Sequence, residues 1–200
     1  MKKRSDRGRG INPEKSPGRI RIIGGQWRSR QLPVPDRPGL RPTPDRLREA
    51  LFNWLQDCIQ GARCLDLFAG SGALGFEAAS RGAAGVVLVE RDPALVHTLE
   101  EQVSVLQAAQ MQVRCSDALR WLNQPQDPFD IIFLDPPFGT DLLPQCLDLI
   151  ASNAMLRTGG RVYVETSLND VPPETDQWMQ IKQTRAGQVR AVLLQMPEGV

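Results

Sequence analysis

The chain has 200 residues, of which 41% are hydrophobic and 24% charged, as is typical of one globular domain with a full core. No apolar run approaches the roughly 18 residues that a membrane-spanning helix needs. No signal-peptide core follows the basic N-terminus, so we expect a cytoplasmic protein that does not contact a membrane. The four cysteines form no C-x-x-C pair, and we predict no metal site.

The net charge of +1 conceals an uneven distribution. Residues 1–48 hold 14 Lys or Arg against 4 Asp or Glu, a balance of +10, whereas the rest of the chain holds 10 against 19, a balance of −9. A basic arm on an acidic body is typical of a protein that contacts a polyanion. For residues 1–18, which we expect to be a disordered basic tail, a purely solubilising role is equally compatible.

A basic hairpin is predicted over residues 19–42. Arginines alternate with isoleucines before Gly24-Gly25, and arginines alternate again after these glycines, which indicates two short strands around a glycine turn. We expect this hairpin to present its arginines on one face, where they contact the phosphates of the polyanionic partner: Arg19, Arg21, Arg28 and Arg30.

The segment "RPTPDRLREALFNWL" predicts a helix. Thr43 can cap its start, and Pro44 suits the first helical position. The apolar residues that follow recur at helical spacing and form one stripe: Leu47, Ala50, Leu51, Trp54 and Leu55.

From residue 62 onward, strand-like segments alternate with helical ones. This order is typical of a mainly parallel, doubly wound α/β sheet. The last two strand-like segments flank Arg185-Ala186-Gly187 and predict a C-terminal antiparallel hairpin. All the strand-like segments together predict a seven-stranded sheet. We expect a single domain over residues 19–200, in which residues 43–200 form the main fold and 19–42 the N-terminal hairpin. The strands are expected at 62–68, 85–90, 111–117, 129–135, 160–166, 178–184 and 188–196.

The stretch "DLFAGSGALG" contains the pattern G-x-G-x-x-G in Gly70, Gly72 and Gly75. Glycines at the start of a helix let the backbone approach a nucleotide ligand closely. Glu90, twenty residues after Gly70, can accept both hydroxyl groups of a ribose. Asp66 would repel a pyrophosphate but attract an ammonium group, so S-adenosylmethionine fits better than a nicotinamide dinucleotide. We also expect Phe68 to contact this cofactor.

Two further acidic residues end predicted strands. Asp117 can bond the adenine amino group of the cofactor or cap the following helix, and both roles can hold together. Asp135 begins "DPPF", in which Asp135 and the carbonyl of Pro136 can accept the two hydrogens of an exocyclic amine. Pro136 and Pro137 make that corner rigid, and Phe138 can stack on an extruded base. The plainer alternative is a tight turn with a capping Asp and a core Phe.

The four segments "RIIGGQWRSRQLPVP", "GLRPTPDRLREALFNWL", "LDLFAGSGALGFEAASRGA" and "DPPF" together resemble the bacterial 16S ribosomal RNA guanine-N2 methyltransferases of the methyltransferase D family. The resemblance covers roughly residues 19–195. It implies a Rossmann-like class I methyltransferase fold, S-adenosylmethionine as methyl donor, and one guanine of 16S ribosomal RNA as substrate. It also implies that Thr43 and Arg46 lie over the cofactor.

From the chemistry of the corner we expect catalysis by Asp135, Pro136, Pro137 and Phe138. Because no large recognition domain is evident, we also expect the RNA to be bound within the small ribosomal subunit. We expect a monomer. Three alternatives stay open at this point: a DNA adenine methyltransferase, a protein glutamine methyltransferase, and a non-catalytic RNA-binding protein on the same fold. A DNA enzyme usually carries a recognition domain, for which this chain has no room.

Overall fold

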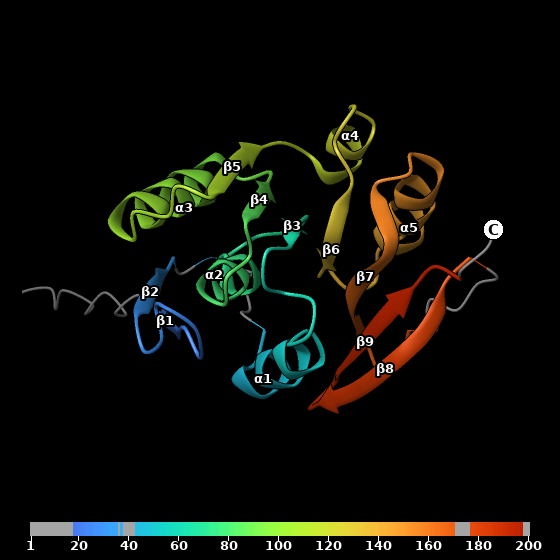
Figure 1. Ribbon diagram of the computed structural model, residues 1–200, viewed down its shortest axis with the longest axis horizontal. Helices are drawn as coiled ribbons and strands as arrows, with labels where there is room; N and C mark the ends of the chain where they lie inside the picture. The colour runs from blue at the N-terminus through green and yellow to red at the C-terminus, as the bar shows by residue number, and fades with distance from the viewer. Residues whose placement is uncertain (1–17, 36, 38–42, 171–176, 198–200) are drawn as a thin grey trace, which may run out of the picture.

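The computed structural model describes residues 18–35, 37, 43–170 and 177–197, so almost all of the predicted basic tail lies outside the described residues. A seven-stranded sheet forms the centre of the molecule, in the order β5-β4-β3-β6-β7-β9-β8 (Figure 1). Its first four pairings are parallel, whereas β9 is antiparallel to both β7 and β8. The strands are β3 (Arg63–Asp66), β4 (Gly85–Glu90), β5 (Met111–Cys115), β6 (Phe129–Leu134), β7 (Leu156–Ser167), β8 (Met179–Ala186) and β9 (Val189–Gln195).

Helices cover both faces of this sheet (Figure 1). Three of them pack on one face with the larger cluster of buried side chains, and the other two pack on the opposite face with a second cluster. No helix in the described ranges is both long and apolar enough to cross a membrane. The doubly wound arrangement predicted from the sequence is therefore confirmed, with helices α1 (Asp45–Trp54), α2 (Ala73–Ser80), α3 (Pro93–Val105), α4 (Ala118–Leu122) and α5 (Leu142–Ser152).

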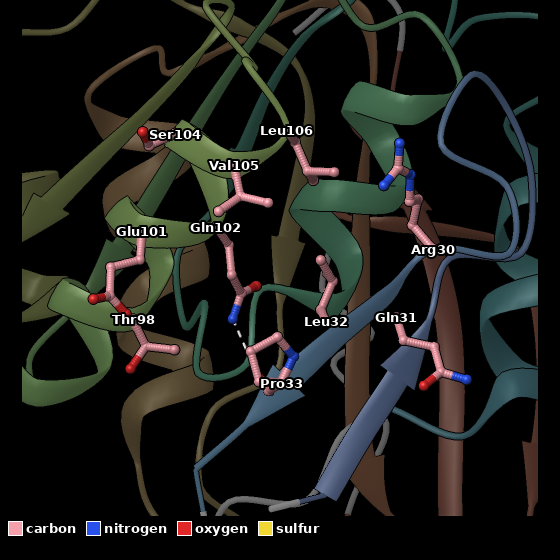
Figure 2. Close-up of a pocket in the computed structure, with 10 residues that line it drawn as sticks. All are labelled: Arg30, Gln31, Leu32, Pro33, Thr98, Glu101, Gln102, Ser104, Val105 and Leu106. Carbon is pink, nitrogen blue, oxygen red and sulfur yellow. Dashed lines mark hydrogen bonds between the residues drawn. The ribbon is translucent and has the colours of Figure 1, made fainter.

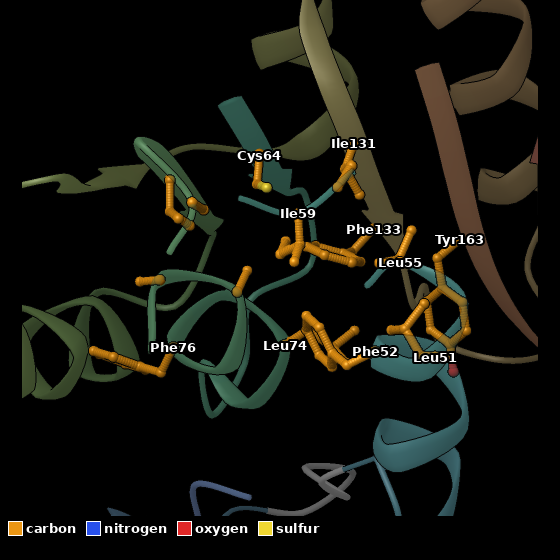
Figure 3. Close-up of a cluster of buried hydrophobic side chains, with 14 of the residues drawn as sticks. Leu51, Phe52, Leu55, Ile59, Cys64, Leu74, Phe76, Ile131, Phe133 and Tyr163 are labelled. Atoms are coloured by element: carbon orange, nitrogen blue, oxygen red, sulfur yellow. The ribbon is translucent and has the colours of Figure 1, made fainter. Parts of the chain in front are cut away.

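The near-continuous apolar strands are explained by burial on both faces. Successive side chains of a strand point to opposite sides. On β6, Ile131 and Phe133 belong to the cluster beneath α1 and α2, which Figure 3 shows, whereas Ile132 and Leu134 belong to the other. All four are fully buried. Each contributes about 1.5–3 kcal/mol of hydrophobic stabilisation, so the sheet is a rigid support for groups at its edges.

The N-terminal hairpin is a separate two-stranded sheet of β1 (Gly18–Arg21) and β2 (Gln31–Val34). The prediction of a hairpin is confirmed, but its second strand begins later than expected. Arg28 lies in a turn and Arg30 just before β2, so their alternation does not belong to a strand. The four hairpin arginines (Arg19, Arg21, Arg28 and Arg30) are nevertheless all exposed.

Contacts with α2 explain why the hairpin strand starts late. The turn is attached to Ser80, whose carbonyl accepts from the amide of Gln26 at 2.8 Å and whose Oγ accepts from the amide of Trp27 at 3.0 Å. Gly25 has a φ of +77°, and a Cβ on it would overlap the Ser80 carbonyl. This close approach holds the turn residues out of the strand.

The first helix also begins one residue later than predicted. Pro44 is the N-cap and Asp45 the first helical residue, and no side chain caps this end. Thr43 is buried and forms a side-chain hydrogen bond with Glu165 on β7, which explains why its hydroxyl does not cap α1. The capping role assigned to Thr43 is therefore wrong.

Candidate functional site

Four acidic side chains meet near one edge of the sheet. Asp66 and Glu90 are the last residues of β3 and β4, and Asp135 directly follows β6. Because these strands run parallel, their carboxyl ends lie at the same edge, where doubly wound sheets bind ligands. Glu165 joins them from β7, since the parallel pairing of β6 with β7 ends one residue before Asp135 and Glu165.

Backbone amides hold the Glu90 carboxylate in place. Its Oε2 accepts from the amide of Gly70 at 2.9 Å, and its Oε1 accepts from the amides of Arg91 at 2.8 Å and Asp92 at 2.9 Å. Asp92 in turn caps α3 by accepting from the amide of Ala94 at 2.8 Å. The glycine loop (residues 70–75) and the end of β4 are therefore joined through the carboxylate that was predicted to bind a ribose.

Asp66 is a buried carboxylate on the floor of the site. Its Oδ2 accepts from the amide of Gly75 at 3.0 Å, and its side chain is almost entirely screened from solvent. Burial raises the pKa of Asp66 to about 7, with further increases from the charges of Glu90 and Glu165, against the lowering effect of the Gly75 hydrogen bond. A Cβ on Gly75 would overlap the side chain of Leu88, so only glycine allows this close approach.

Gly72 shows a packing requirement that the sequence did not indicate. It caps α2 in the left-handed region, with a φ of +77°. A Cβ on it would lie 2.6 Å from the ring of Phe76 and 2.7 Å from Leu99. Replacing Gly72 would therefore disturb the core directly, whatever ligand approaches the loop.

The Asp135–Phe138 corner projects from the end of β6. Pro136 is buried, whereas Pro137 and Phe138 are exposed, and the Phe138 side chain is 47% exposed. Thr140 donates its hydroxyl hydrogen to the carbonyl of Pro137 at 2.7 Å, which stabilises the turn. An aromatic ring this exposed does not belong to the core, so the plainer interpretation of Phe138 as a core residue is wrong.

Burial and neighbouring negative charges both disfavour the ionised form of Asp135. Burial raises its pKa well above the usual value, and the nearby charges of Glu165 and Asp66 raise it further. Burial also raises the pKa of Glu165, while hydrogen bonds from Thr43 and Tyr163 lower it; the Tyr163 hydroxyl donates to Glu165 Oε1 at 2.9 Å. Carboxylates in this arrangement attract a cationic ligand.

Sequence reasoning missed Glu165. The available signal was a single acidic residue inside the otherwise apolar stretch "VYVET", which is unexpected for a strand covered on both faces. Its hydrogen bond with Thr43 brings the segment before α1 to this edge, so Thr43 lies in the site.

The remaining predicted cofactor residues lie in different surroundings. Asp117 is exposed and caps α4, accepting from the amide of Arg120 at 3.1 Å, which confirms the capping role. Phe68 is half-buried and packs against the second core cluster. Arg46 is exposed on α1. Cofactor contacts by these three residues stay predictions. No group of three or more His, Cys, Asp or Glu within the described ranges is arranged to hold a metal ion.

Known proteins share this sequence and fold. The family model described as conserved hypothetical protein 95 matches residues 20–195. Ribosomal RNA small subunit methyltransferase D of Escherichia coli K12 is 49% identical over 179 residues, which cover 89% of this chain and 90% of the relative. The Haemophilus influenzae protein of the same name is 41% identical over 189 residues, covering 92% and 98%.

The chain belongs to the methyltransferase D family. A solved structure from Escherichia coli, described as a methyltransferase, matches with a TM-score of 0.81 at 47% identity, covering 90% of this chain and 98% of that chain. The resemblance stated from the sequence and the class I methyltransferase fold are thus confirmed. Within the family fold, the candidate active site consists of the Asp135–Phe138 corner and the acidic side chains at the same edge of the sheet: Asp66, Glu90 and Glu165.

Proposed function

We propose that the protein transfers the methyl group of S-adenosylmethionine to the exocyclic N2 of one guanine in 16S ribosomal RNA. The observation that carries this proposal is the Asp135–Phe138 corner, with its two prolines and exposed aromatic ring, beside the carboxylates of Asp66 and Glu165. Relatives named ribosomal RNA small subunit methyltransferase D support the RNA substrate.

The residues present fit the donor. The charges of Glu90 and Glu165 raise the pKa of Asp66, and the charges of Glu165 and Asp66 raise the pKa of Asp135. A cation bound among these carboxylates would relieve that repulsion. In this proposal Asp66 faces the ammonium group and Glu90 accepts the ribose hydroxyls. S-adenosylmethionine supplies an electrophilic methyl group on a sulfonium. The other proposed donor contacts come from the loop and its surroundings: Thr43, Arg46, Phe68, Gly70, Gly72 and Asp117.

Asp135 and the Pro136 carbonyl would accept the two hydrogens of the guanine amine. The lone pair of an exocyclic amine is delocalised into its ring, and these hydrogen bonds would turn it toward the methyl group. Because Pro136 and Pro137 stiffen the corner, little reorganisation is needed when the bond forms. The raised pKa of Asp135 makes its carboxylate a stronger base, able to take the proton that the methylated nitrogen releases.

The RNA would be held by the hairpin and by Phe138. The four hairpin arginines are exposed and suit contacts with phosphates. Phe138 would stack on the extruded guanine. We further propose that a monomer acts on RNA within the small ribosomal subunit, in the cytoplasm. The corner suits any base with an exocyclic amine, so the choice of guanine rests on the family resemblance.

The product identifies the function. Small subunits from cells that lack this protein are incubated with it and methyl-labelled S-adenosylmethionine, and the RNA is digested to nucleosides for chromatography with mass detection. We expect one labelled nucleoside, N2-methylguanosine, from one site. Asp135→Ala should abolish most of the label, and Asp135→Asn, which keeps one acceptor oxygen, should retain more. Label in N6-methyladenosine, in DNA added to a parallel reaction, or only in glutamine residues of the subunit proteins would refute the guanine assignment.

A further inference from the structure

A groove lies between the hairpin and the second half of α3, away from the Asp135–Phe138 corner. Its volume is about 470 Å³. Figure 2 shows the apolar side chains of Leu32 and Pro33 on β2 facing Val105 and Leu106 at the end of α3. Val105 is 79% exposed, which is unusual for a large apolar side chain and leaves one wall of the groove uncovered.

The groove contains a buried hydrogen-bond acceptor without a partner. The Gln102 side chain donates from its Nε2 to the carbonyl of Pro33 at 2.9 Å. A carbonyl can only accept, so the amide nitrogen must face Pro33 and the oxygen must face away from it. This oxygen is buried and has no partner among the described residues, although Gln102 is only 5% exposed. Buried polar atoms are usually satisfied, so a ligand with a donor is expected here.

Charge is distributed along the groove. Figure 2 shows Arg30 and Glu101 at opposite ends of it. Arg30 belongs to the hairpin that carries the other three exposed arginines, and Glu101 forms an ion pair with His97 at 3.3 Å if that histidine is protonated. Apolar walls, a buried acceptor without a partner and a cation at one end match an unpaired nucleotide: a flat base with an N–H donor on its edge, and a phosphate beside it.

We propose that this groove binds an unpaired base of the RNA substrate, other than the base that is methylated. A ring N–H or exocyclic amine of that base donates to Gln102 Oε1, its ring packs on Val105, and its phosphate lies near Arg30. Gln102 is ten residues beyond Asp92 at the active-site edge, about 15 Å along the helix, too far for one base to occupy both sites. The inference rests on the proposed function, since it assigns a second contact to the same RNA.

A charge placed in the groove tests this directly. Val105→Asp puts a carboxylate in the wall, and because Val105 is exposed the fold should be retained. Ala109→Asp makes the same change of charge at an exposed position outside the groove and serves as the control. Val105→Ala removes apolar surface without adding charge. For each variant, KM for the small subunit, kcat and S-adenosylmethionine affinity are measured, together with binding to protein-free 16S RNA.

We expect Val105→Asp to raise KM for the subunit and weaken binding of protein-free RNA by about tenfold. Val105→Ala should have a smaller effect in the same direction, and kcat and donor affinity should not change. If Val105→Asp and Ala109→Asp behave alike, no base binds here. An effect on subunits but not on protein-free RNA would assign the groove to a ribosomal protein and overturn the inference. Failure of the wild type to form N2-methylguanosine would instead refute the proposed function.

Discussion

We predict that the buried carboxylate of Asp66 makes donor binding depend on pH. Its pKa is about 7, and a cationic donor should bind the ionised form. The ionised fraction is about 3% at pH 5.5 and about 50% at pH 7.0, so S-adenosylmethionine affinity should rise by about 15-fold over this range. The range ends at pH 7.0 because the amino group of the donor itself begins to lose its proton above that value.

The stability of the free protein should change in the opposite direction. Because burial raises the pKa of Asp66 above its usual 3.8, the folded state binds this proton more tightly than the unfolded chain does. The resulting stabilisation is present at acid pH and is lost as the pH rises from about 4 to about 7; the full shift corresponds to about 4 kcal/mol. Urea unfolding without donor at pH 5.5 and 7.0 measures the part of this loss that falls in that range, about 1.6 kcal/mol.

Two variants separate Asp66 from its neighbours. Asp66→Asn keeps an oxygen for the Gly75 amide but cannot ionise, so donor affinity at pH 7.0 should fall to the wild-type value at pH 5.5 and stay flat with pH. Glu165→Gln removes a charge that raises the pKa of Asp66, so the midpoint should move to lower pH. Titration calorimetry gives both results. A wild-type affinity that does not change between pH 5.5 and 7.0 would refute the reasoning, as would the same slope in Asp66→Asn.

Four other variants test the rest of the site. Asp135→Ala should lower the methylation rate by about 100- to 1,000-fold with little change in donor affinity, measured by single-turnover kinetics. Phe138→Ala should weaken RNA binding by about 1–3 kcal/mol, and because the ring is 47% exposed the unfolding free energy should hardly change. Replacing all four hairpin arginines by Ala should reduce the salt dependence of RNA binding by about 0.7–0.9 in slope for each phosphate that the hairpin no longer binds, without affecting donor affinity. Glu77→Gln should destabilise the fold by about 3–5 kcal/mol in urea, because it leaves the buried Arg48 with a weakened partner.

Most of the sheet could be predicted because its signals are local. The strands read as apolar runs bounded by glycine, proline or an acid, and residues such as Asp66 and Glu90 stand where those runs end. Because the carboxyl ends of parallel strands lie at one edge of the sheet, such residues can be placed there from the sequence alone. The pattern of the Asp135–Phe138 corner was equally local, so its position after β6 followed from the sequence.

The errors arose where distant segments compete with local signals. Thr43 has a side chain that can cap a helix, but it is hydrogen-bonded to Glu165, which lies more than a hundred residues away in the sequence. Arg28 and Arg30 alternate as strand residues do, but hydrogen bonds from the turn to Ser80 hold that segment in another conformation. Periodicity in a single sequence contains no information about either contact.

Two buried charges on the helices, Arg48 and Glu77, were not predicted, because both also have partners far away in the sequence. Arg48 is only 1% exposed and donates to Asp45 at 2.6 Å and to the carbonyl of Arg21 at 2.9 Å. Glu77 is a single acid in the apolar helix α2 and is fully buried. An isolated acid in such a helix indicates a buried partner, but the sequence does not say which of its many arginines that partner is.

Glu77 explains how the hairpin is fixed relative to the active site. Its carboxylate accepts from the amides of Ile23 and Gly24, both at 2.8 Å, and pairs with Arg81 at 2.7 Å and with Arg48 at 3.5 Å. The helix that carries Glu77 begins at the glycine loop, whose first glycine is bonded to Glu90. The arginines proposed for RNA and the carboxylates proposed for the donor are therefore attached to the two ends of one short, buried helix. Because α2 is short and buried, it sets the distance from the hairpin to the proposed site of methyl transfer. RNA held on the hairpin would therefore meet the Asp135–Phe138 corner at a constant spacing.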